Sequence, residues 1–337
     1  MGGAPLTARR GLAALLVAGL TAVGCSAGAG GEADTAETSG STSSTAPPVT
    51  VTTVPLPPPE YTLEPYRGLG TWVDVFDFSP RFAGDRGPQV SPADLDAMAD
   101  AGVETIYLQA ARDEQDIPGG IPDPGIVGAF LEGAHERGMA VVAWYLPRRF
   151  DDDDLSRLQA LANFRAGPGR DQAFDGLAVD IEWRKGVPEL EERNRALVEF
   201  STRVREVMGD AVIGAIVLPP VLLEVVNEKY WASFPWRGIA PLYDVWLPMS
   251  YWTDRQWASG YQDPYVYTDE TVRRMRNNLG LPDAVTHVIG GIGDKVAPGD
   301  HAGLGRAVVE HGAVGVSLYD WASLPEDQRP RLREALG

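Results

Sequence analysis

Short apolar runs alternate with amphipathic segments along residues 61–337, and this alternation is the strongest structural signal in the sequence. Apolar runs of this length, bounded by turn residues, are typical of buried strands. We expect eight strands, at residues 70–78, 103–109, 140–146, 174–182, 211–218, 243–251, 286–291 and 313–319.

Helix signals lie between these runs. Ser91 followed by Pro92 predicts an N-cap with proline at the first helical position, and the segments 123–124 and 324–326 indicate further helix starts. Residues 189–208 form a long amphipathic pattern, and residues 221–230 carry the weakest signal. Eight strand–helix alternations favour a parallel sheet that closes on itself. The predicted fold is α/β, a single (β/α)8 TIM barrel over residues 61–337.

The first 24 residues have the pattern of an export signal. Arg9 and Arg10 precede a short apolar run at 11–23, which is too short for a membrane span. Cys25, the single cysteine, follows directly and resembles the processing and lipidation site of bacterial lipoproteins. The alternative is an ordinary signal peptide with an incidental cysteine. We expect the protein to be exported and held on the outer face of the bacterial cell membrane by a lipid on Cys25.

Residues 25–60 are rich in Ser, Thr, Gly, Ala and Pro and end in a proline run. This composition cannot bury a core, so we expect a disordered tether between the anchor and the barrel.

The formal net charge is −18, with 29 basic and 47 acidic residues. Nucleic acids and anionic lipid headgroups are poor partners for such a surface, and neutral or cationic ligands suit it better. We expect no nucleic-acid partner and no membrane contact apart from the anchor. The sequence leaves the oligomeric state open.

Two carboxylates end the fourth predicted strand. Asp180 and Glu182 are two residues apart, so their side chains project to the same face. Like charges repel and burial disfavours ionised carboxylates, so such a pair is costly and points to a functional site. The alternatives are a solvated strand end, or neutralisation by Arg184 and Lys185.

The active sites of TIM barrels lie at the carboxyl ends of the strands. Aromatic side chains are numerous near these ends, above all in the segment 252–267, and aromatic walls with interspersed carboxylates suit the apolar faces and hydroxyls of sugars. We expect that segment to form an exposed binding wall. The candidate residues at or just past strand ends are Asp77, Gln109, Tyr145, Asp180, Glu182, Met249, Tyr251, Trp252, Asp320 and Trp321.

The fourth predicted strand resembles that of the chitinase-type glycoside hydrolases, family 18, which carries a D-x-x-D-x-D-x-E signature. Asp175, Asp180 and Glu182 match its first, third and fourth positions, and Ala178 stands at the second. The run 248–251 resembles the M-x-Y of the family's sixth strand.

Other positions extend or limit the resemblance. Trp252 follows the sixth strand where the family often has an acid or amide, and Trp321 lies near the position of the tryptophan that floors its sugar pocket. The third strand reads Val-Ala-Trp-Tyr at 142–145 in place of the family's S-x-G-G.

The resemblance implies a glycoside-hydrolase-like barrel acting on a glycan. Glu182 would be the general acid, Asp180 would orient a 2-acetamido group or stabilise positive charge at the anomeric carbon, and Tyr251 would hydrogen-bond the reacting group. Asp175 would belong to the substrate-binding set. A two-carboxylate mechanism needs a second acid, and the candidates are Asp77, Asp254 and Asp320.

The glycine-rich run 290–293 follows the seventh strand and has two interpretations. It is either a backbone cradle for an anionic ligand or a tight turn that needs positive φ. The four histidines, at 135, 287, 301 and 311, show no metal-ligand spacing. The acidic run 151–154 is typical of a helix N-terminus rather than a calcium site. We therefore expect no metal and no cofactor.

Three functions remain open at this stage. The first is a lipid-anchored glycoside hydrolase acting on an extracellular or cell-wall glycan. The second is a catalytically silent barrel that binds glycan, because Ala178 and the third strand depart from the family pattern. The third is an exported barrel enzyme of another class that binds an anionic ligand at residues 290–293.

Overall fold

The protein is represented by a computed structural model, which describes residues 60–114, 117–182 and 189–336. Eight parallel strands form one sheet in the order β6-β5-β4-β3-β2-β1-β8-β7. The strands are β1 (Gly68–Val73), β2 (Thr105–Gln109), β3 (Ala140–Tyr145), β4 (Gly176–Ile181), β5 (Ile213–Val217), β6 (Val245–Pro248), β7 (His287–Ile292) and β8 (Gly315–Tyr319). All eight predicted strands are present.

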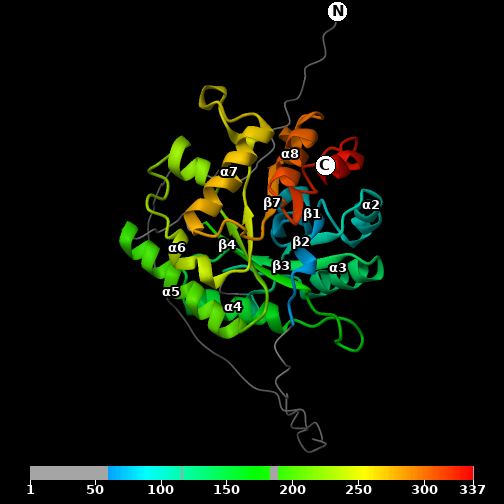
Figure 1. The fold of residues 1–337 in the computed structure, drawn as a ribbon. Helices are drawn as coiled ribbons and strands as arrows, with labels where there is room; N and C mark the ends of the chain where they lie inside the picture. The colour runs from blue at the N-terminus through cyan, green and yellow to red at the C-terminus, as the bar shows by residue number, and fades with distance from the viewer. Residues whose placement is uncertain (1–59, 115–116, 183–188, 337) are drawn as a thin grey trace, which may run out of the picture. The chain divides into compact units, whose positions relative to one another are not determined.

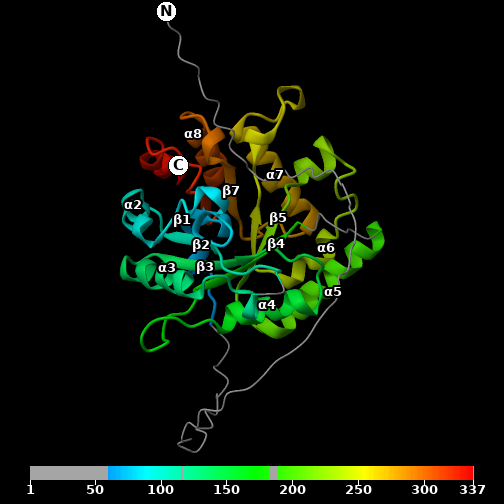
Figure 2. The same cartoon turned by 180° about the vertical axis from the view of Figure 1, so that it is seen from behind.

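Two isolated parallel bridges, Trp246–Thr286 and Met249–Ile289, join β6 to β7 and complete the circle. Figures 1 and 2 show the longer helices surrounding the strands on all sides. The α-helices are α1 (Val75–Phe78), α2 (Leu95–Asp100), α3 (Pro124–Glu136), α4 (Asp152–Asn163), α5 (Leu190–Met208), α6 (Trp236–Ile239), α7 (Pro264–Leu279) and α8 (Asp300–Glu310). The predicted (β/α)8 barrel is confirmed.

Short helical turns fill several connections. The ones that matter below are η1 (Glu64–Tyr66), η7 (Trp252–Asp254), η8 (Trp257–Ser259) and η10 (Arg329–Leu336), and the weak segment 221–230 contains the turn η5 (Leu222–Val226).

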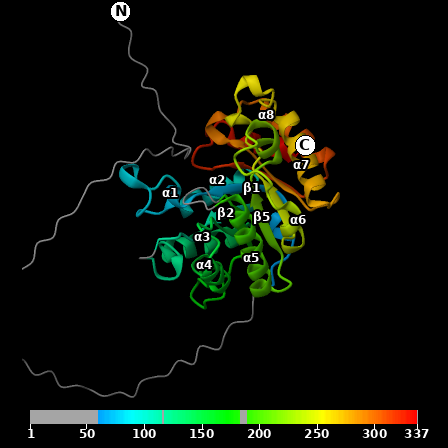
Figure 3. The ribbon, with the colours of Figure 1, turned by 90° about the vertical axis from the view of Figure 1, so that its left-hand side faces the viewer.

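The first strand is shorter at its carboxyl end than predicted. It ends at Val73, and the helix α1 takes up residues that we assigned to the strand. The cause is a capping box, in which Asp74 accepts a hydrogen bond from the Phe76 N–H and Asp77 accepts one from the Asp74 N–H. In the side view of Figure 3, α1 lies to the left of β1, at the carboxyl ends of the strands.

The C-terminal segment also differs from the prediction. The segment 324–326 was expected to begin a helix, but the next helical element, η10, begins at Arg329. Ser91 caps the turn before α2 as predicted, since its hydroxyl accepts from the Ala93 N–H. The acidic run 151–154 begins α4, with Asp151 as the N-cap.

The amino end of the barrel is closed by packed side chains. The Tyr66 hydroxyl donates to the Leu177 carbonyl at 2.7 Å, so η1 plugs the barrel from below. Glycines make room for this plug. A Cβ on Gly176 would lie 3.1 Å from the Tyr66 hydroxyl, and a Cβ on Gly214 would lie 3.0 Å from the Tyr66 ring.

A hydrogen-bonded chain runs up the barrel interior from this plug. His287 Nδ1 lies 2.9 Å from the Tyr66 carbonyl oxygen, which can only accept, so Nδ1 carries the proton. His287 Nε2 then accepts from the Ser317 hydroxyl, and Ser317 Oγ accepts from Trp72 Nε1 at 2.8 Å. Burial lowers the pKa of His287 to about 4, so the imidazole is neutral at physiological pH.

Residues 1–59, including the predicted signal, Cys25 and most of the tether, lie outside the described residues. Among the helices that the structure describes, none combines the length and apolar content of a membrane span.

Candidate functional site at the carboxyl end of the barrel

The structure places Asp180, in β4, and Glu182, which follows this strand, near Tyr251. Ala178 lies inside the barrel, where its Cβ would be 3.3 Å from a Cβ on Gly214, so Asp180 and Glu182 face the same way by strand alternation. The charges of Glu182, Asp180, Asp320 and Asp254 all act on the Tyr251 hydroxyl. Burial is the largest cause of its raised pKa, and these four carboxylates raise it further. Side chains that follow β4, β6 and β8 therefore converge on one phenol.

A second group of carboxylates lies at the ends of β1 and β8. The Tyr319 hydroxyl donates to Asp74 Oδ2 at 2.6 Å, and Tyr319 also lies beside Tyr251, with 6.1 Å between ring centroids. This ring contact links the two groups. Asp320 follows Tyr319 directly, and its Oδ1 accepts from the Ser323 N–H at 2.7 Å.

These acids hold protons more tightly than exposed carboxyls do. Burial, and then the charges of Asp320 and Asp74, raise the pKa of Asp77 to about 8. Burial, opposed in part by the hydrogen bonds from Ser323, raises the pKa of Asp320 to about 6. Burial is also the largest cause of the raised pKa of Asp74. At neutral pH, Asp77 is therefore mostly protonated and Asp320 mostly ionised.

Sequence reasoning missed Asp74. The signal that identifies it is the spacing Asp74–Asp77, an N-cap residue followed by an acid three positions later. That pattern predicts a helix start at residue 74 instead of a continuing strand, and it places both carboxyls on the rim of the barrel.

Trp144 lies beside Ala178, the position at which the family 18 signature has its second acid. It is the register partner of Ala178 on the neighbouring strand, and both side chains are buried. Neighbouring side chains on the same face of a sheet share the space between them. The indole therefore takes up the volume beside Ala178, so the changes on β3 and β4 fit each other.

Trp144 lies in an aromatic cluster just below the acids. Its ring meets the Trp72 ring edge-on, with 5.7 Å between centroids, and Trp72 stacks on Tyr107 at 4.4 Å. In the described part of the chain, the buried Trp144 Nε1–H has no hydrogen-bond acceptor.

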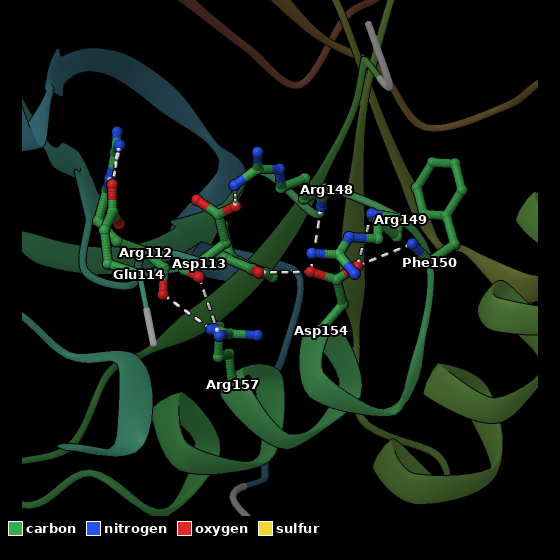
Figure 4. A network of polar contacts seen from close by, with 9 residues as sticks. Arg112, Asp113, Glu114, Arg148, Arg149, Phe150, Asp154 and Arg157 are labelled. Carbon is green, nitrogen blue, oxygen red and sulfur yellow. Dashed lines mark hydrogen bonds and ion pairs between the residues drawn. The ribbon is translucent and has the colours of Figure 1, made fainter. Parts of the chain in front are cut away.

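Tyr145 has a structural role. Its hydroxyl donates to Asp154 Oδ1 at 2.5 Å, and Asp154 also accepts from the N–H groups of Arg148, Arg149 and Phe150 (Figure 4). Residues 151–154 therefore form a helix start, as predicted. Asp154 is not solvated, however, because its side chain is buried.

The same network ties two rim loops together. Arg148 pairs with Asp113 at 2.7 Å, and Arg157 donates to the carbonyls of Arg112 and Asp113 (Figure 4). A cavity of about 330 Å³ lies among these charged side chains. Since each of these arginines has an acceptor within the protein, the network fixes the loops after β2 and β3.

Two other candidates also have structural roles. Gln109 ends β2, but its side-chain oxygen accepts from the Val75 N–H and so holds the start of α1. Asp175 precedes β4, at the opposite end of the barrel from Glu182. There it accepts from His135 Nε2 at 2.9 Å and from the Val141 N–H at 2.7 Å. The structure therefore does not bring Asp175, expected to bind substrate, together with Glu182.

The segment 252–267, expected to form an exposed wall, is mostly exposed or partly exposed, but two of its five aromatic side chains are buried. Trp252 and Tyr267 are 2% and 0% exposed. Trp252 Nε1 donates to Asp300 Oδ2 at 3.0 Å, so this indole packs against the start of α8. Trp257, in η8, is 85% exposed, and Tyr261 and Tyr265 are partly exposed.

Trp321 and Met249 are buried as well, at 1% and 4% exposure. The Arg329 guanidinium covers the Trp321 ring at 4.4 Å, which places that indole against η10 and away from the barrel mouth. The expected sugar contacts of Trp252 and Trp321 are therefore not supported, because helical elements outside the barrel cover both rings.

The glycine run 290–293 lies largely within β7, so it is neither a ligand-binding loop nor a tight turn. A Cβ on Gly290 would lie 2.6 Å from Leu318, and one on Gly291 would lie 2.7 Å from Thr253. Gly293 is similarly close to the Leu324 backbone. Close packing of neighbouring side chains and backbone therefore accounts for these glycines.

Across the described ranges, no group of three or more His, Cys, Asp or Glu side chains is placed to hold a metal ion. His287 lies at the start of β7, as expected. A second cavity, of about 710 Å³, lies at the amino end of the barrel beside Arg165 and Asp175. It is remote from the carboxylates at the strand ends.

No protein-family model matches the sequence, and no curated protein matches it. Solved structures do share the fold. The Bacillus cereus spore cortex-lytic enzyme SleL has a TM-score of 0.53 and 10% identity, and the match covers 80% of this chain and 74% of that one.

Two further structures are comparable. The SleL enzyme of Bacillus megaterium QM B1551 has a TM-score of 0.52 and 9% identity, over 80% of this chain and 74% of that one. The catalytic domain of psychrophilic chitinase B from Arthrobacter TAD20 has a TM-score of 0.50 and 8% identity, over 82% and 96%. The predicted resemblance to a glycoside-hydrolase barrel is confirmed at the level of the fold: this chain shares the (β/α)8 barrel of these glycan-active enzymes.

Proposed function

We propose that the protein hydrolyses glycosidic bonds in an extracellular or cell-wall glycan, with Glu182 as the general acid. The observation that carries the proposal is that the charges of Glu182, Asp180 and Asp320 all act on the Tyr251 hydroxyl and raise its pKa. Glycoside hydrolysis needs one carboxyl to protonate the leaving oxygen and another to assist at the anomeric carbon. Carboxyls on facing strands of one barrel mouth can supply both.

The roles follow from position. Glu182 lies at the tip of β4 and is only partly buried, so it can reach a glycosidic oxygen in the mouth. Asp180 is one step deeper and 8% exposed, where its charge can stabilise the positive charge that develops on the sugar. Tyr251 keeps its proton because its pKa is raised, so it can donate a hydrogen bond to the reacting group.

Asp320 is the best candidate for the second carboxylate. Its pKa of about 6 leaves it mostly ionised at neutral pH, while neighbouring Asp77, with a pKa of about 8, keeps its proton. The pair therefore provides one carboxylate with a proton donor beside it. A charged group in this position can activate water or stabilise the cationic transition state.

The names of the similar structures suggest where to begin a substrate search. A cortex-lytic enzyme and a chitinase are among them. The first substrates to test are therefore peptidoglycan and oligomers of N-acetylglucosamine.

The test compares turnover by the purified protein, Glu182→Gln and Glu206→Gln on a glycan panel. Glu206 is an exposed acid on α5 and serves as the matched control. We expect Glu182→Gln to lose about 10²–10⁴-fold in kcat, since general acid catalysis is worth that much, and Glu206→Gln to keep full activity. Undiminished turnover in Glu182→Gln would reject the assignment of the acid.

A second candidate function is a catalytically silent glycan-binding barrel. Trp144 and Ala178 favour it, because together they replace the small third-strand residues and the second acid of the family pattern. Binding measured beside turnover separates the two functions. A protein that binds glycans from the panel and cleaves none of them is a binding barrel.

We also propose that a lipid on Cys25 anchors the protein to the outer face of the bacterial cell membrane. The support is the sequence pattern of a positively charged start, a short apolar run and a single cysteine. Replacement Cys25→Ser should move the protein from the membrane fraction to the soluble exported fraction. Continued membrane association of Cys25→Ser would reject the anchor.

A further inference from the structure

The loop that follows Tyr251 holds one indole out into solvent. Trp257 is 85% exposed, whereas the next most exposed large apolar side chain among the described residues, Val309, is 59% exposed. Exposed aromatic surface is unfavourable in water, and binding to an apolar face recovers that free energy.

The turn that carries Trp257 is held in shape by its own hydrogen bonds. The Ser259 hydroxyl donates to the Gln256 carbonyl at 2.6 Å, and the Gln262 amide donates to the Arg255 carbonyl at 2.8 Å. Gly260 closes the turn with φ of 73°. An exposed side chain on a braced turn is preorganised for a ligand, because less freedom is lost on binding.

The loop is also fixed to the rim of the candidate site. It begins immediately after Tyr251, and Thr253 accepts a hydrogen bond from the Ile292 N–H at 3.0 Å. Lys295 pairs with Asp254 at 2.6 Å and joins the loop to the segment after β7. These contacts fix the start of the loop beside Tyr251, at the carboxyl end of β6.

The surroundings favour a sugar over a lipid surface. The residues near Trp257 in the sequence are the uncharged amides Gln256 and Gln262, the acids Asp254 and Asp263 and the base Arg255, in a chain of net charge −18. Because Asp254 pairs with Lys295, this segment has no excess of positive charge. Acids repel an anionic membrane surface, which attracts basic segments instead. A pyranose ring offers an apolar face for the indole and hydroxyls for the neighbouring amides.

We propose that Trp257 is an outlying sugar-binding platform that stacks on a unit of the glycan several residues from the bond placed at Glu182. This inference rests on the proposed glycan function of the same barrel mouth. It adds that the substrate is a chain long enough to reach from the catalytic acids to the β6–α7 loop, so short oligosaccharides do not use the platform.

The test measures binding in full-length protein carrying Glu182→Gln, so that the glycan is not consumed. The probes are the hexamer and the dimer of N-acetylglucosamine, and soluble peptidoglycan strands. We expect Trp257→Ala to weaken hexamer and strand binding about fivefold to tenfold, as loss of one aromatic stacking contact does, and to leave dimer binding unchanged. Trp257→Tyr should retain most of the affinity, and Val309→Ala is the control for an exposed apolar side chain.

The outcomes separate this inference from the proposed function. Equal affinity of Trp257→Ala and its parent for hexamer and strands overturns the platform and leaves hydrolysis untouched. Weaker binding in Trp257→Ala together with no turnover by the wild type supports the platform and rejects the hydrolase. If Trp257→Ala loses binding to phosphatidylglycerol vesicles that its parent binds, and keeps its glycan binding, the platform is overturned in favour of a membrane contact. A wild type that binds none of the glycans rejects both proposals.

Discussion

The two ends of the barrel use polar side chains in opposite ways. At the amino end, Tyr66 and His287 are fully buried, and each hydrogen-bonds to fixed partners inside the protein. At the carboxyl end, burial, and then the charges of neighbouring acids, raise the pKa values of Asp77 and Asp320. The same eight strands run to both ends, so the difference lies in the side chains. The polar groups at the amino end are paired within the protein, and the carboxyl end gathers several acids.

The two kinds of polar group differ in what they indicate about function. His287 is buried, has a lowered pKa and has a hydrogen-bond partner at both ring nitrogens. Its neutral form needs no further partner, so its role is to stabilise the fold. Carboxyls whose pKa is raised by burial and by neighbouring acids cost stability, and such clusters are concentrated where chemistry uses them. On this criterion the carboxyl end is the functional end, although the larger cavity, of about 710 Å³, lies at the other.

The largest effect is expected at the closed end. A Cβ on Gly315 would lie 2.3 Å from His287 Nδ1 and 2.5 Å from the Tyr66 carbonyl oxygen, so Gly315→Val forces the plug apart. We expect a loss of more than about 3 kcal/mol in the free energy of unfolding, measured by denaturant titration. Gly299→Ala, where nothing lies near the added carbon, is the control. An unchanged midpoint for Gly315→Val would show that the amino end is loosely packed.

The pair Trp144–Ala178 comes next. Ala178→Asp adds a carboxyl to a fully buried position beside the indole, so we expect it to cost about 3 kcal/mol of stability. If the two residues fit each other, Trp144→Ser in the same chain should offset part of that cost. A double-mutant cycle should show a coupling of about 1 kcal/mol or more. Additive effects would mean that the two changes are independent.

The smallest expected effect concerns the acids themselves. The pKa of Asp77 is raised from 3.8 to about 8, so the native state binds this proton more tightly than the unfolded chain does. Its contribution to stability is therefore fully present below pH 4 and is lost as the pH rises toward 8. Asp77→Asn cannot ionise, and it should match the wild type near pH 4 and exceed it at pH 8. The full shift corresponds to about 5 kcal/mol, and solvent screening of this partly exposed carboxyl reduces the expected difference to about 1–3 kcal/mol.

The measurement is the free energy of unfolding across that range, with the exposed Asp210→Asn as control. A difference between Asp77→Asn and the wild type that does not change with pH would contradict the crowded-acid account of the carboxyl end.

The sequence predicted the architecture because each strand is an apolar run bounded by turn residues, a pattern set by burial alone. It also placed Asp180, Glu182 and Tyr251 at one end, since strand alternation and the barrel geometry suffice for that. The sequence assigned Asp77 to the first strand because the apolar pattern continues to residue 78. In the structure the capping contact between Asp74 and Asp77 begins a helix there instead.

Other assignments depended on contacts between segments distant in sequence. Asp175 bonds to His135 on α3, and Trp252 bonds to Asp300 on α8, so neither role is visible in local sequence. The glycines at 290–293 are explained by neighbours from the β6–α7 loop, β8 and the segment after it. Residue type suggested ligand binding at each of these positions, and tertiary packing accounts for them instead.

The central claim is that Glu182 donates a proton to the leaving group at the carboxyl end. The most direct test compares wild type and Glu182→Gln on a natural glycan and on a dinitrophenyl glycoside of the same sugar, whose leaving group departs without protonation. The account predicts a loss of about 10²–10⁴-fold on the glycan and less than about tenfold on the activated glycoside. Equal losses on both substrates, or no loss on either, would contradict it.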